Sequence, residues 1–261
     1  MGVLNVTPDS FSDGGEFFSA QSAIKHGLSL IEDGAEIIDI GGESTRPGAE
    51  SLTIDNELNR VLPVIEEIRK RNNEILISID TYKSEVAKQA IECGADIVND
   101  ISGFTMDSKM PTIVSDYGVP VILMHIKGNP KTMQNNPEYD DVIEEINSYF
   151  RNQISIAKAA KINPEKIILD PGIGFGKNLE HNFSILNRLN QLCVHGYPIM
   201  IGTSRKSFIG LTLDLPPNDR VEGTAATVSV GIMNGARIIR VHDVKEMKRV
   251  VTIVEKIRLA I

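Results

Sequence analysis

Three polar residues that could bind a flat heterocycle each end a run of apolar residues. Asp80, Asn99 and Asp170 follow such runs, so their side chains should be half buried. A buried carboxylate needs hydrogen-bond donors, and its two oxygens match an amino group next to a ring N–H. Asn99 can both donate and accept, which suits a mixed heterocycle edge. From the residues alone, structural pairing of the acids with Lys206 or Arg240 explains them equally well.

Basic residues gather late in the chain, in GTSRKSF at residues 202–208 and in RIIRVHD at residues 237–243. Arg240 and His242 should share a strand face, because they are two positions apart. In a chain with a formal net charge of −8, these segments bring positive charge to one place. The pattern therefore predicts a binding site for phosphate groups.

Asn5, Asp9 and Asp13 offer hard oxygen ligands near the end of the first apolar run. Such ligands suit Mg²⁺, which usually binds through one or two protein groups together with substrate phosphates. No spacing of His and Cys residues indicates a zinc site. We interpret His125, which follows the run PVILM, as a structural hydrogen-bonding group.

Two long segments rich in Gly, Ser and Thr could close over a ligand, at residues 7–19 and 41–51. Connections of this length in a compact domain are usually lids or binding loops. A third segment, DPGIGFGK at residues 170–177, carries three glycines that allow the backbone close to a flat ligand. Phe175 within it can stack on such a ligand.

Short runs rich in β-branched residues predict the strands that position these groups. They cover residues 1–6, 36–40, 75–80, 96–99, 120–124, 166–170, 198–202 and 236–241. Apolar stripes with helical spacing lie between them, at residues 20–33, 56–71, 142–160, 183–192, 222–234 and 244–259. Strands that alternate with helices indicate βαβ units and a parallel sheet.

One helix-to-strand junction recurs in EDGAEIIDI, ECGADIVND, DYGVPVILM and MNGARIIRV. In each copy a glycine able to adopt the left-handed conformation is followed at once by a strand. These four junctions point to one architecture throughout, and eight βα units, in a chain of the size typical for this fold, predict an α/β protein. Its fold is a single-domain (β/α)8 TIM barrel over residues 1–261.

A doubly wound open sheet is the alternative fold, but the glycine-rich dinucleotide turn is missing after the first strand. Barrel enzymes place their chemistry at the carboxyl ends of the strands. Nearly all the predicted strands carry polar groups there, so we expect one polar pocket at that rim.

The composition excludes several classes of protein. A net charge of −8 argues against general binding to nucleic acid or to membrane surfaces. Cys93 and Cys193 form no C-x-x-C pair, which indicates free thiols in an intracellular protein. No secretory signal or membrane-spanning run is present, so we expect a cytoplasmic location.

Taken together, these motifs resemble the dihydropteroate synthase family of folate biosynthesis. The resemblance extends over the chain through MGVLNVTPDSFSDGG, GGESTRPG, SIDTYKSEVA, VNDISG, VILMH, LDPGIGFGK, GTSRKSFIG and RVHDV. It implies a transferase that joins 6-hydroxymethyl-7,8-dihydropterin diphosphate to 4-aminobenzoate, giving 7,8-dihydropteroate and pyrophosphate. It also implies Mg²⁺ as cofactor, a homodimer, and competition by sulfonamides for the aminobenzoate site.

The resemblance also implies roles for single residues. Pterin contacts would come from Asp80, Asn99, Met124, Asp170, Gly174, Lys206 and Arg240. Diphosphate contacts would come from Asn5, Arg46, Arg240 and His242, with Asn5 also a metal ligand. The aminobenzoate would lie among Thr45, Pro47, Phe175, Lys206 and Ser207. The lid would use Asp9, Ser10 and Phe11, and the catalytic group would comprise Lys206, Arg240 and Asp80.

The expected intermediate is a ring-stabilised pterin cation, formed as Mg²⁺ and the cationic rim stabilise the leaving diphosphate. The arylamine then attacks, and no protein nucleophile is required. Two other interpretations remain: a pterin-dependent methyltransferase of the methyltetrahydrofolate type, and a non-catalytic pterin-binding barrel. The segment TPDSFSDGG and the RVHD end argue against the first, and the presence of Asn5, Lys206 and Arg240 argues against the second.

Overall fold

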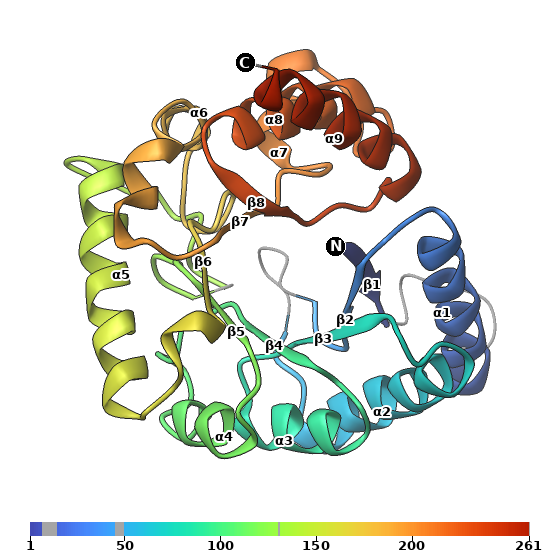
Figure 1. Ribbon diagram of the computed structural model, residues 1–261. Helices are drawn as coiled ribbons and strands as arrows, with labels where there is room; N and C mark the ends of the chain where they lie inside the picture. Colours follow the sequence, from blue (N-terminus) through green and yellow to red (C-terminus); the bar gives the residue numbers. More distant parts are fainter. Residues whose placement is uncertain (7–14, 45–49, 130, 261) are drawn as a thin grey trace.

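The computed structural model describes residues 1–6, 15–44, 50–129 and 131–260, and its strands form a ring with helices around the outside (Figure 1). The strands are β1 (Gly2–Asn5), β2 (Ile37–Gly41), β3 (Leu76–Asp80), β4 (Ile97–Asp100), β5 (Val121–Met124), β6 (Ile167–Asp170), β7 (Ile199–Ile201) and β8 (Ala236–Ile239). They pair in chain order, and all the pairs are parallel.

Helices follow the strands and cover the outer face of the sheet (Figure 1). The α-helices are α1 (Gly15–Glu32), α2 (Ile54–Arg71), α3 (Ser84–Glu92), α4 (Met110–Tyr117), α5 (Val142–Ala159), α6 (Leu179–Asn187), α7 (Ser207–Leu213), α8 (Val221–Met233) and α9 (Val244–Leu259). Two 3₁₀ segments, η2 (Pro164–Lys166) and η3 (Leu189–His195), precede β6 and β7.

Hydrogen bonds between the first and last strand regions close the sheet into a barrel. The backbone N–H of Val3 donates to the carbonyl oxygen of Val241 at 3.0 Å, and the N–H of Val241 donates to the carbonyl oxygen of Met1 at 2.9 Å. A parallel bridge joins Gly2 to Val241. The predicted (β/α)8 barrel is therefore confirmed, and the doubly wound open sheet is excluded.

Each predicted strand overlaps an observed one, but two predicted boundaries are wrong. Residues 15–19, predicted to belong to a loop, form the start of α1, which begins at Gly15; no glycine or proline interrupts residues 16–26. Residues 7–14 of that predicted loop lie outside the described residues. The helix predicted over residues 183–192 is a shorter α6 followed by η3. Asn178 begins α6 early, since its side chain accepts from the N–H of His181 in a capping box.

The recurring glycine junctions have the predicted left-handed backbone. Gly34, Gly94, Gly118 and Gly235 have φ angles of 99°, 112°, 60° and 111°. A residue with a Cβ atom is strained at these angles, so glycine allows the chain to leave each helix and enter the next strand directly.

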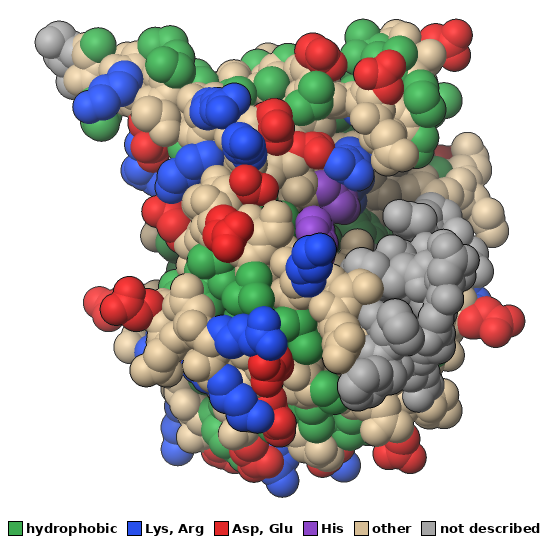
Figure 2. Space-filling view, turned by 90° about the vertical axis from the view of Figure 1, so that its right-hand side faces the viewer, with side chains coloured by type: hydrophobic (Ala, Val, Ile, Leu, Met, Phe, Trp, Pro, Cys, Tyr) green, Lys and Arg blue, Asp and Glu red, His purple; other side chains and the backbone are tan. Residues whose placement is uncertain are grey.

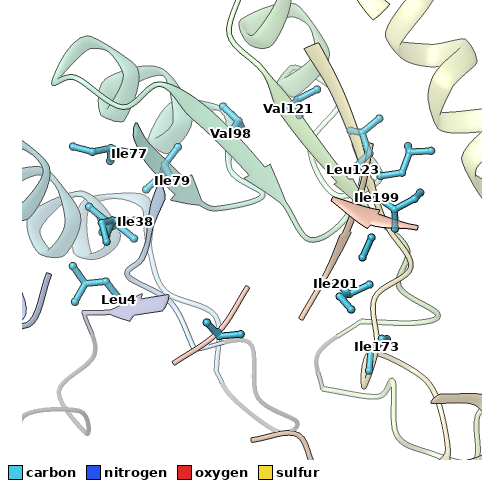
Figure 3. Packing of buried hydrophobic residues seen from close by; sticks show 14 of the residues in the cluster. Leu4, Ile38, Ile77, Ile79, Val98, Val121, Leu123, Ile173, Ile199 and Ile201 are labelled. Atoms are coloured by element: carbon cyan, nitrogen blue, oxygen red, sulfur yellow. The ribbon is translucent and has the colours of Figure 1, made fainter. Parts of the chain in front are cut away.

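Alternate residues of each strand face opposite sides of the barrel wall. One set packs against the helices and forms the main core, including Leu4, Ile38, Ile79, Leu123 and Ile201 (Figure 3). The other set faces inward, where a second apolar cluster contains Ile97, Ile122 and Met200. This inner cluster fills the barrel below the level of the polar strand ends.

The face of the molecule shown in Figure 2 carries acidic and basic side chains interspersed with apolar ones. Cys93 and Cys193 are both free thiols, as predicted. Within the ranges described above, no helix is both long and apolar enough to cross a bilayer.

Candidate functional site

A pocket lies at the carboxyl ends of the strands and contains most of the predicted pterin contacts. The predicted residues that line it are Asp80, Asn99, Met124, Asp170, Phe175, Lys206 and Arg240. Gly172, one of the three glycines predicted to allow the backbone close to a ligand, also lines it. Three further lining residues had no predicted role: Ile101, Ile173 and Gly202. Apolar residues in the loops that follow polar strand ends are the signal that could have indicated Ile101 and Ile173.

The two-residue repeat of the strands explains why these groups converge. In five strands an inner apolar residue of the barrel interior is followed, two positions later, by a pocket residue. These pairs are Ile97 and Asn99, Ile122 and Met124, Ile168 and Asp170, Met200 and Gly202, and Ile238 and Arg240. The apolar layer thus forms the floor, and the polar layer above it forms the pocket.

Arg240 links two acids that come from the first third of the chain. Its Nε atom donates to Asp39 Oδ2 at 2.6 Å, and its Nη2 atom donates to Asp80 Oδ2 at 2.7 Å. The structural pairing considered for Asp80 is therefore present. Asp39 lies two residues before the end of β2 at Gly41. It is one of the polar residues expected near the carboxyl ends of the strands, but no binding role was predicted for it.

The same pairing leaves hydrogen-bond acceptors available. Oδ1 of Asp80 and Oδ1 of Asn99 are buried and have no hydrogen-bond partner among the described residues. Burial, with help from the nearby charge of Asp39, raises the pKa of Asp80 to about 7, although Arg240 acts to lower it. An unsatisfied buried acceptor is unfavourable, so a ligand with N–H donors would complete the site.

Asp170 is held by the backbone that follows it. Its Oδ1 atom accepts from the N–H of Gly172 at 2.7 Å. Burial raises the pKa of Asp170, while this N–H and the charge of Lys206 act to lower it. The second carboxylate oxygen of Asp170 can accept from a ligand in the pocket that this residue lines.

Lys206 reaches the pocket from the loop between β7 and α7. Its ammonium donates to the carbonyl oxygen of Ile173 at 2.8 Å and lies 4.1 Å from the ring centroid of Phe175. Burial, together with the charge of Arg240, lowers the pKa of Lys206 to about 8, although Asp170 and Asp80 act to raise it. The side chain can therefore donate to a ligand lying between the two loops.

Two of the three glycines of DPGIGFGK are required where the loop packs on the chain after β5; Gly172 also lines the pocket, and its approach to a flat ligand stays a prediction. A Cβ atom on Gly172 would lie 1.9 Å from the carbonyl oxygen of His125, and one on Gly176 would lie 2.4 Å from that of Lys127. These glycines let the loop pack on the chain that follows β5. Gly174, predicted to contact pterin, is not among the pocket-lining residues and packs against Lys206.

His125 is structural, as interpreted from the sequence. It is buried, and its Nδ1 atom lies 2.9 Å from the ammonium of Lys177, which also donates to the carbonyl oxygen of Phe175 at 2.9 Å. Lys177 is 2% exposed and had no predicted role. It joins the β5 and β6 loops beneath Phe175.

The predicted diphosphate residues Asn5 and His242 and the predicted aminobenzoate residue Ser207 are not among the lining residues of the pocket. Nδ1 of His242 is 3.0 Å from Ser204 Oγ. Burial and the charges of Arg240 and Arg205 lower the pKa of His242 to about 4, so the expected positive charge on this histidine is absent near pH 7. Asn5 ends β1, and Ser207 is the exposed first residue of α7.

Several predicted site residues fall outside the described part of the chain. Thr45, Arg46 and Pro47 of the second loop and Asp9, Ser10 and Phe11 of the first are in this group. Their assignments stay predictions.

A buried ion cluster joins the two ends of the second loop to the neighbouring helices. The ammonium of Lys83 donates to Glu43 Oε2 at 2.5 Å and also to Glu57. Glu43 further accepts from the hydroxyl of Tyr82 at 3.0 Å and from the N–H of Leu52 at 2.8 Å. Burial acts to lower the pKa of Lys83, but its hydrogen bonds to the two carboxylates outweigh this and raise it.

We expect Lys83→Met to lower the free energy of unfolding by about 3–5 kcal/mol, because it leaves two buried carboxylates without their cation. Glu57 is 1% exposed, and its Oε1 atom has no hydrogen-bond partner among the described residues. Urea denaturation measures the change. The matched control is Arg71→Met, which breaks the exposed pair with Glu67 and should cost at most about 1 kcal/mol. Equal losses of unfolding free energy in both variants would contradict the interpretation that the Lys83 cluster is a buried, stabilising ion cluster.

The fold and the pocket define a class: a (β/α)8 barrel with a pocket at its rim that is lined by acids, an amide and cations. The family described as "Pterin binding enzyme" matches residues 1–242. The chain belongs to the dihydropteroate synthase family. The dihydropteroate synthase of Synechocystis sp. is 51% identical over 251 residues, which cover 96% of this chain and 86% of that protein.

Solved structures agree with this assignment. The Yersinia pestis dihydropteroate synthase in a sulfonamide drug complex superposes with a TM-score of 0.94 at 45% identity, covering 100% of this chain and 94% of that one. The Clostridium difficile enzyme, crystallised in the presence of pteroic acid, gives 0.93 at 46% identity, covering 98% and 95%. The chain is accordingly a transferase, and these relatives favour neither the methyltransferase nor the non-catalytic barrel.

Proposed function

We propose that the pocket binds the pterin ring of 6-hydroxymethyl-7,8-dihydropterin diphosphate and that 4-aminobenzoate binds at its outer edge. The products are then 7,8-dihydropteroate and pyrophosphate. The observation that carries this proposal is the pair of buried acceptors without described partners, Oδ1 of Asp80 and Oδ1 of Asn99, in a pocket that Asp170 also lines. A pterin offers an amino group and ring N–H groups to such acceptors.

The opposite wall supports a site for the arylamine. Phe175 offers an aromatic face, and the ammonium of Lys206 lies over it. The relative from Clostridium difficile was crystallised with pteroic acid, a pterin joined to 4-aminobenzoate, and the relative from Yersinia pestis was crystallised with a sulfonamide. We therefore place the aminobenzoate beside Phe175, Lys206 and Ser207, with Thr45 and Pro47 from the second loop, and expect sulfonamides to compete there.

The diphosphate is proposed to lie above Arg240, near Asn5 and His242, with Arg46 from the second loop. The amide oxygen of Asn5 is a hard ligand of the kind that Mg²⁺ accepts. In the described ranges no group of three His, Cys, Asp or Glu side chains could hold a metal. That arrangement fits an ion held by Asn5 and mainly by the substrate's own phosphates. When bound, Mg²⁺ would neutralise negative charge on the leaving diphosphate.

The chain's own residues support departure of the diphosphate before the arylamine attacks. Asp80 and Asp170 would favour positive charge on the pterin ring, since both are buried acids in the pocket. Arg240, beside which the diphosphate is proposed to bind, would stabilise the negative charge that develops on this group as it departs. The floor of apolar side chains limits access of water from below, which protects a reactive pterin cation.

Two broader properties complete the proposal. Exposed apolar side chains on α7, α8 and α9 are typical of an interaction surface, which supports a homodimer. They are Leu211, Leu213, Val230, Met233, Ile253, Ile257 and Leu259. The free thiols of Cys93 and Cys193 support a cytoplasmic location.

The direct test supplies the purified protein with the dihydropterin diphosphate, 4-aminobenzoate and Mg²⁺ and measures pyrophosphate. We expect release that requires both substrates and that is lost when EDTA removes the metal and restored by added Mg²⁺. Release of pyrophosphate without 4-aminobenzoate measures capture of the pterin by water and serves as the background. Absence of release under every condition would reject the synthase reaction.

A further inference from the structure

Asp39 is a fully buried acid on β2 that contacts two of the proposed pterin-binding residues. Its Oδ2 atom accepts from Arg240 Nε at 2.6 Å. Nδ2 of Asn99 lies 3.1 Å from Oδ2 of Asp39 and 3.3 Å from its Oδ1. Asp39 itself is not among the residues that line the pocket. It therefore joins β4 and β8 to β2 from behind the ligand site.

The chemistry of this contact determines which end of the Asn99 amide faces the pocket. An ionised carboxylate only accepts hydrogen bonds, so the amide nitrogen must face Asp39. The amide oxygen then points away from Asp39, and it is buried without a hydrogen-bond partner among the described residues. Because Asn99 lines the pocket, an N–H group of a ligand can donate a hydrogen bond to that oxygen.

A second observation argues that Asp39 does more than neutralise Arg240. Arg240 already has a carboxylate partner in Asp80, at 2.7 Å. A further buried acid places negative charge close to Asp80, and after burial it is the largest contribution that raises the pKa of Asp80. Repulsion of this kind is unfavourable unless the second acid provides specific hydrogen bonds.

We propose that Asp39 is a positioning residue, which holds the Asn99 amide with its oxygen toward the pterin and holds the Arg240 guanidinium beside Asp80. The inference rests on the pterin site proposed above and adds to it. It assigns an N–H donor, rather than an acceptor, to the part of the ligand edge that meets Asn99 Oδ1.

The test is Asp39→Asn, a variant of nearly the same volume. Both carboxylate oxygens of Asp39 lie within 3.3 Å of Asn99 Nδ2, so in either orientation the new amide places its nitrogen beside the nitrogen of Asn99. We expect this contact between two donors to displace the Asn99 amide and its oxygen. We expect the binding of free hydroxymethylpterin, measured by titration calorimetry, to weaken about tenfold, as for the loss of one hydrogen bond. The Michaelis constant for 4-aminobenzoate should change by less than about twofold, since Asp39 contacts none of the residues proposed to bind that substrate.

A double-mutant cycle with Asn99→Ala separates positioning from a general structural role. If Asp39 acts through Asn99, Asp39→Asn should weaken pterin binding by less than about threefold in the Asn99→Ala background. Equal losses in both backgrounds, or wild-type pterin affinity in Asp39→Asn alone, would overturn the inference. Asp39→Ser, measured in parallel, keeps one acceptor in a smaller volume, so the result does not depend on one variant folding.

The matched control is Asp100→Asn, one residue after Asn99 on β4. Asp100 is also fully buried, but it accepts from Ser102 and from the N–H of Phe104 on the outer side of the strand. This variant should lose stability while its pterin Kd stays within about twofold of wild type. If the wild-type protein releases pyrophosphate but Asp39→Asn binds the pterin as tightly as the wild type, only the positioning role of Asp39 is rejected. Absence of release by the wild type would reject the proposed reaction, whatever the binding result.

Discussion

Lys206→Ala is expected to lower kcat/KM for the dihydropterin diphosphate by about two to three orders of magnitude, as for loss of one preorganised donor in an active site. Its ammonium lies between the Ile173 carbonyl oxygen and the Phe175 ring, in the wall shared by the two proposed substrate positions. A steady-state pyrophosphate assay measures the effect. Because Lys206 lies in the wall shared by both substrate positions, its removal should lower kcat/KM for the dihydropterin diphosphate and for 4-aminobenzoate. Loss of a contact to one substrate alone would lower only one of these values.

Lys206→Met is the matched control for this prediction, because it keeps the apolar stem that packs on Gly174 and Phe175 and removes only the charge. If the ammonium is what matters, Met and Ala should be similarly impaired. Activity close to wild type in Lys206→Met would show that packing, rather than charge, is the contribution of this side chain.

The same ammonium predicts a pH dependence. Burial and the charge of Arg240 lower the pKa of Lys206 to about 8. Since the protonated form is the hydrogen-bond donor, kcat/KM should fall as the pH rises through about 8. The residual activity of Lys206→Met should lack this alkaline decline. A decline of the same shape in that variant would assign the titration to another group.

Asp170→Asn is expected to raise the Kd of the pterin by roughly 10- to 100-fold, the range for loss of a hydrogen bond to a charged group. The structure indicates which way the new amide would turn. Its oxygen would stay with the N–H of Gly172, which donates to Oδ1 of Asp170 at 2.7 Å. The amide nitrogen would then face the pocket, where it would meet the N–H donors of the pterin edge.

Asp96→Asn is the matched control for that variant. Asp96 pairs with Arg69 and accepts from the N–H of Ile77 at the amino-terminal end of the barrel. It should affect stability but leave the pterin Kd within about twofold of wild type, because distant sites act independently. An unchanged pterin affinity in Asp170→Asn would remove this residue from the site.

Local spacing along the chain was sufficient to predict the strands and the residues that end them. Each strand is a short β-branched run, and Asp80, Asn99 and Asp170 stand at or next to its last position. The parallel arrangement then brings such ends together without further information, because all carboxyl ends of a parallel barrel lie at one rim. For this reason most of the pterin contacts could be named from the sequence.

Contacts between distant segments could not be predicted in this way. Arg240 bonds to Asp39 and Asp80 across 201 and 160 residues, a relation that exists only once the barrel closes. Asp39 is one of the polar residues near the carboxyl ends of the predicted strands, but that position did not reveal its bonds to Asn99 and Arg240. Lys177 looks like a surface residue until its partners are known. The ionisation of His242 likewise depends on its burial beside Arg240.

The sequence by itself determined the order of strands and helices, the glycine junctions between them, and the side chains that reach the rim, because these depend on periodicity within a few residues. Only the tertiary structure decided which hydrogen bonds and contacts form at the rim: which atom of the Asn99 amide faces the pocket, which acids share Arg240, and what the glycines of residues 172–176 approach. Those features depend on closure of the sheet, which places residues from opposite ends of the chain within hydrogen-bonding distance in a buried space.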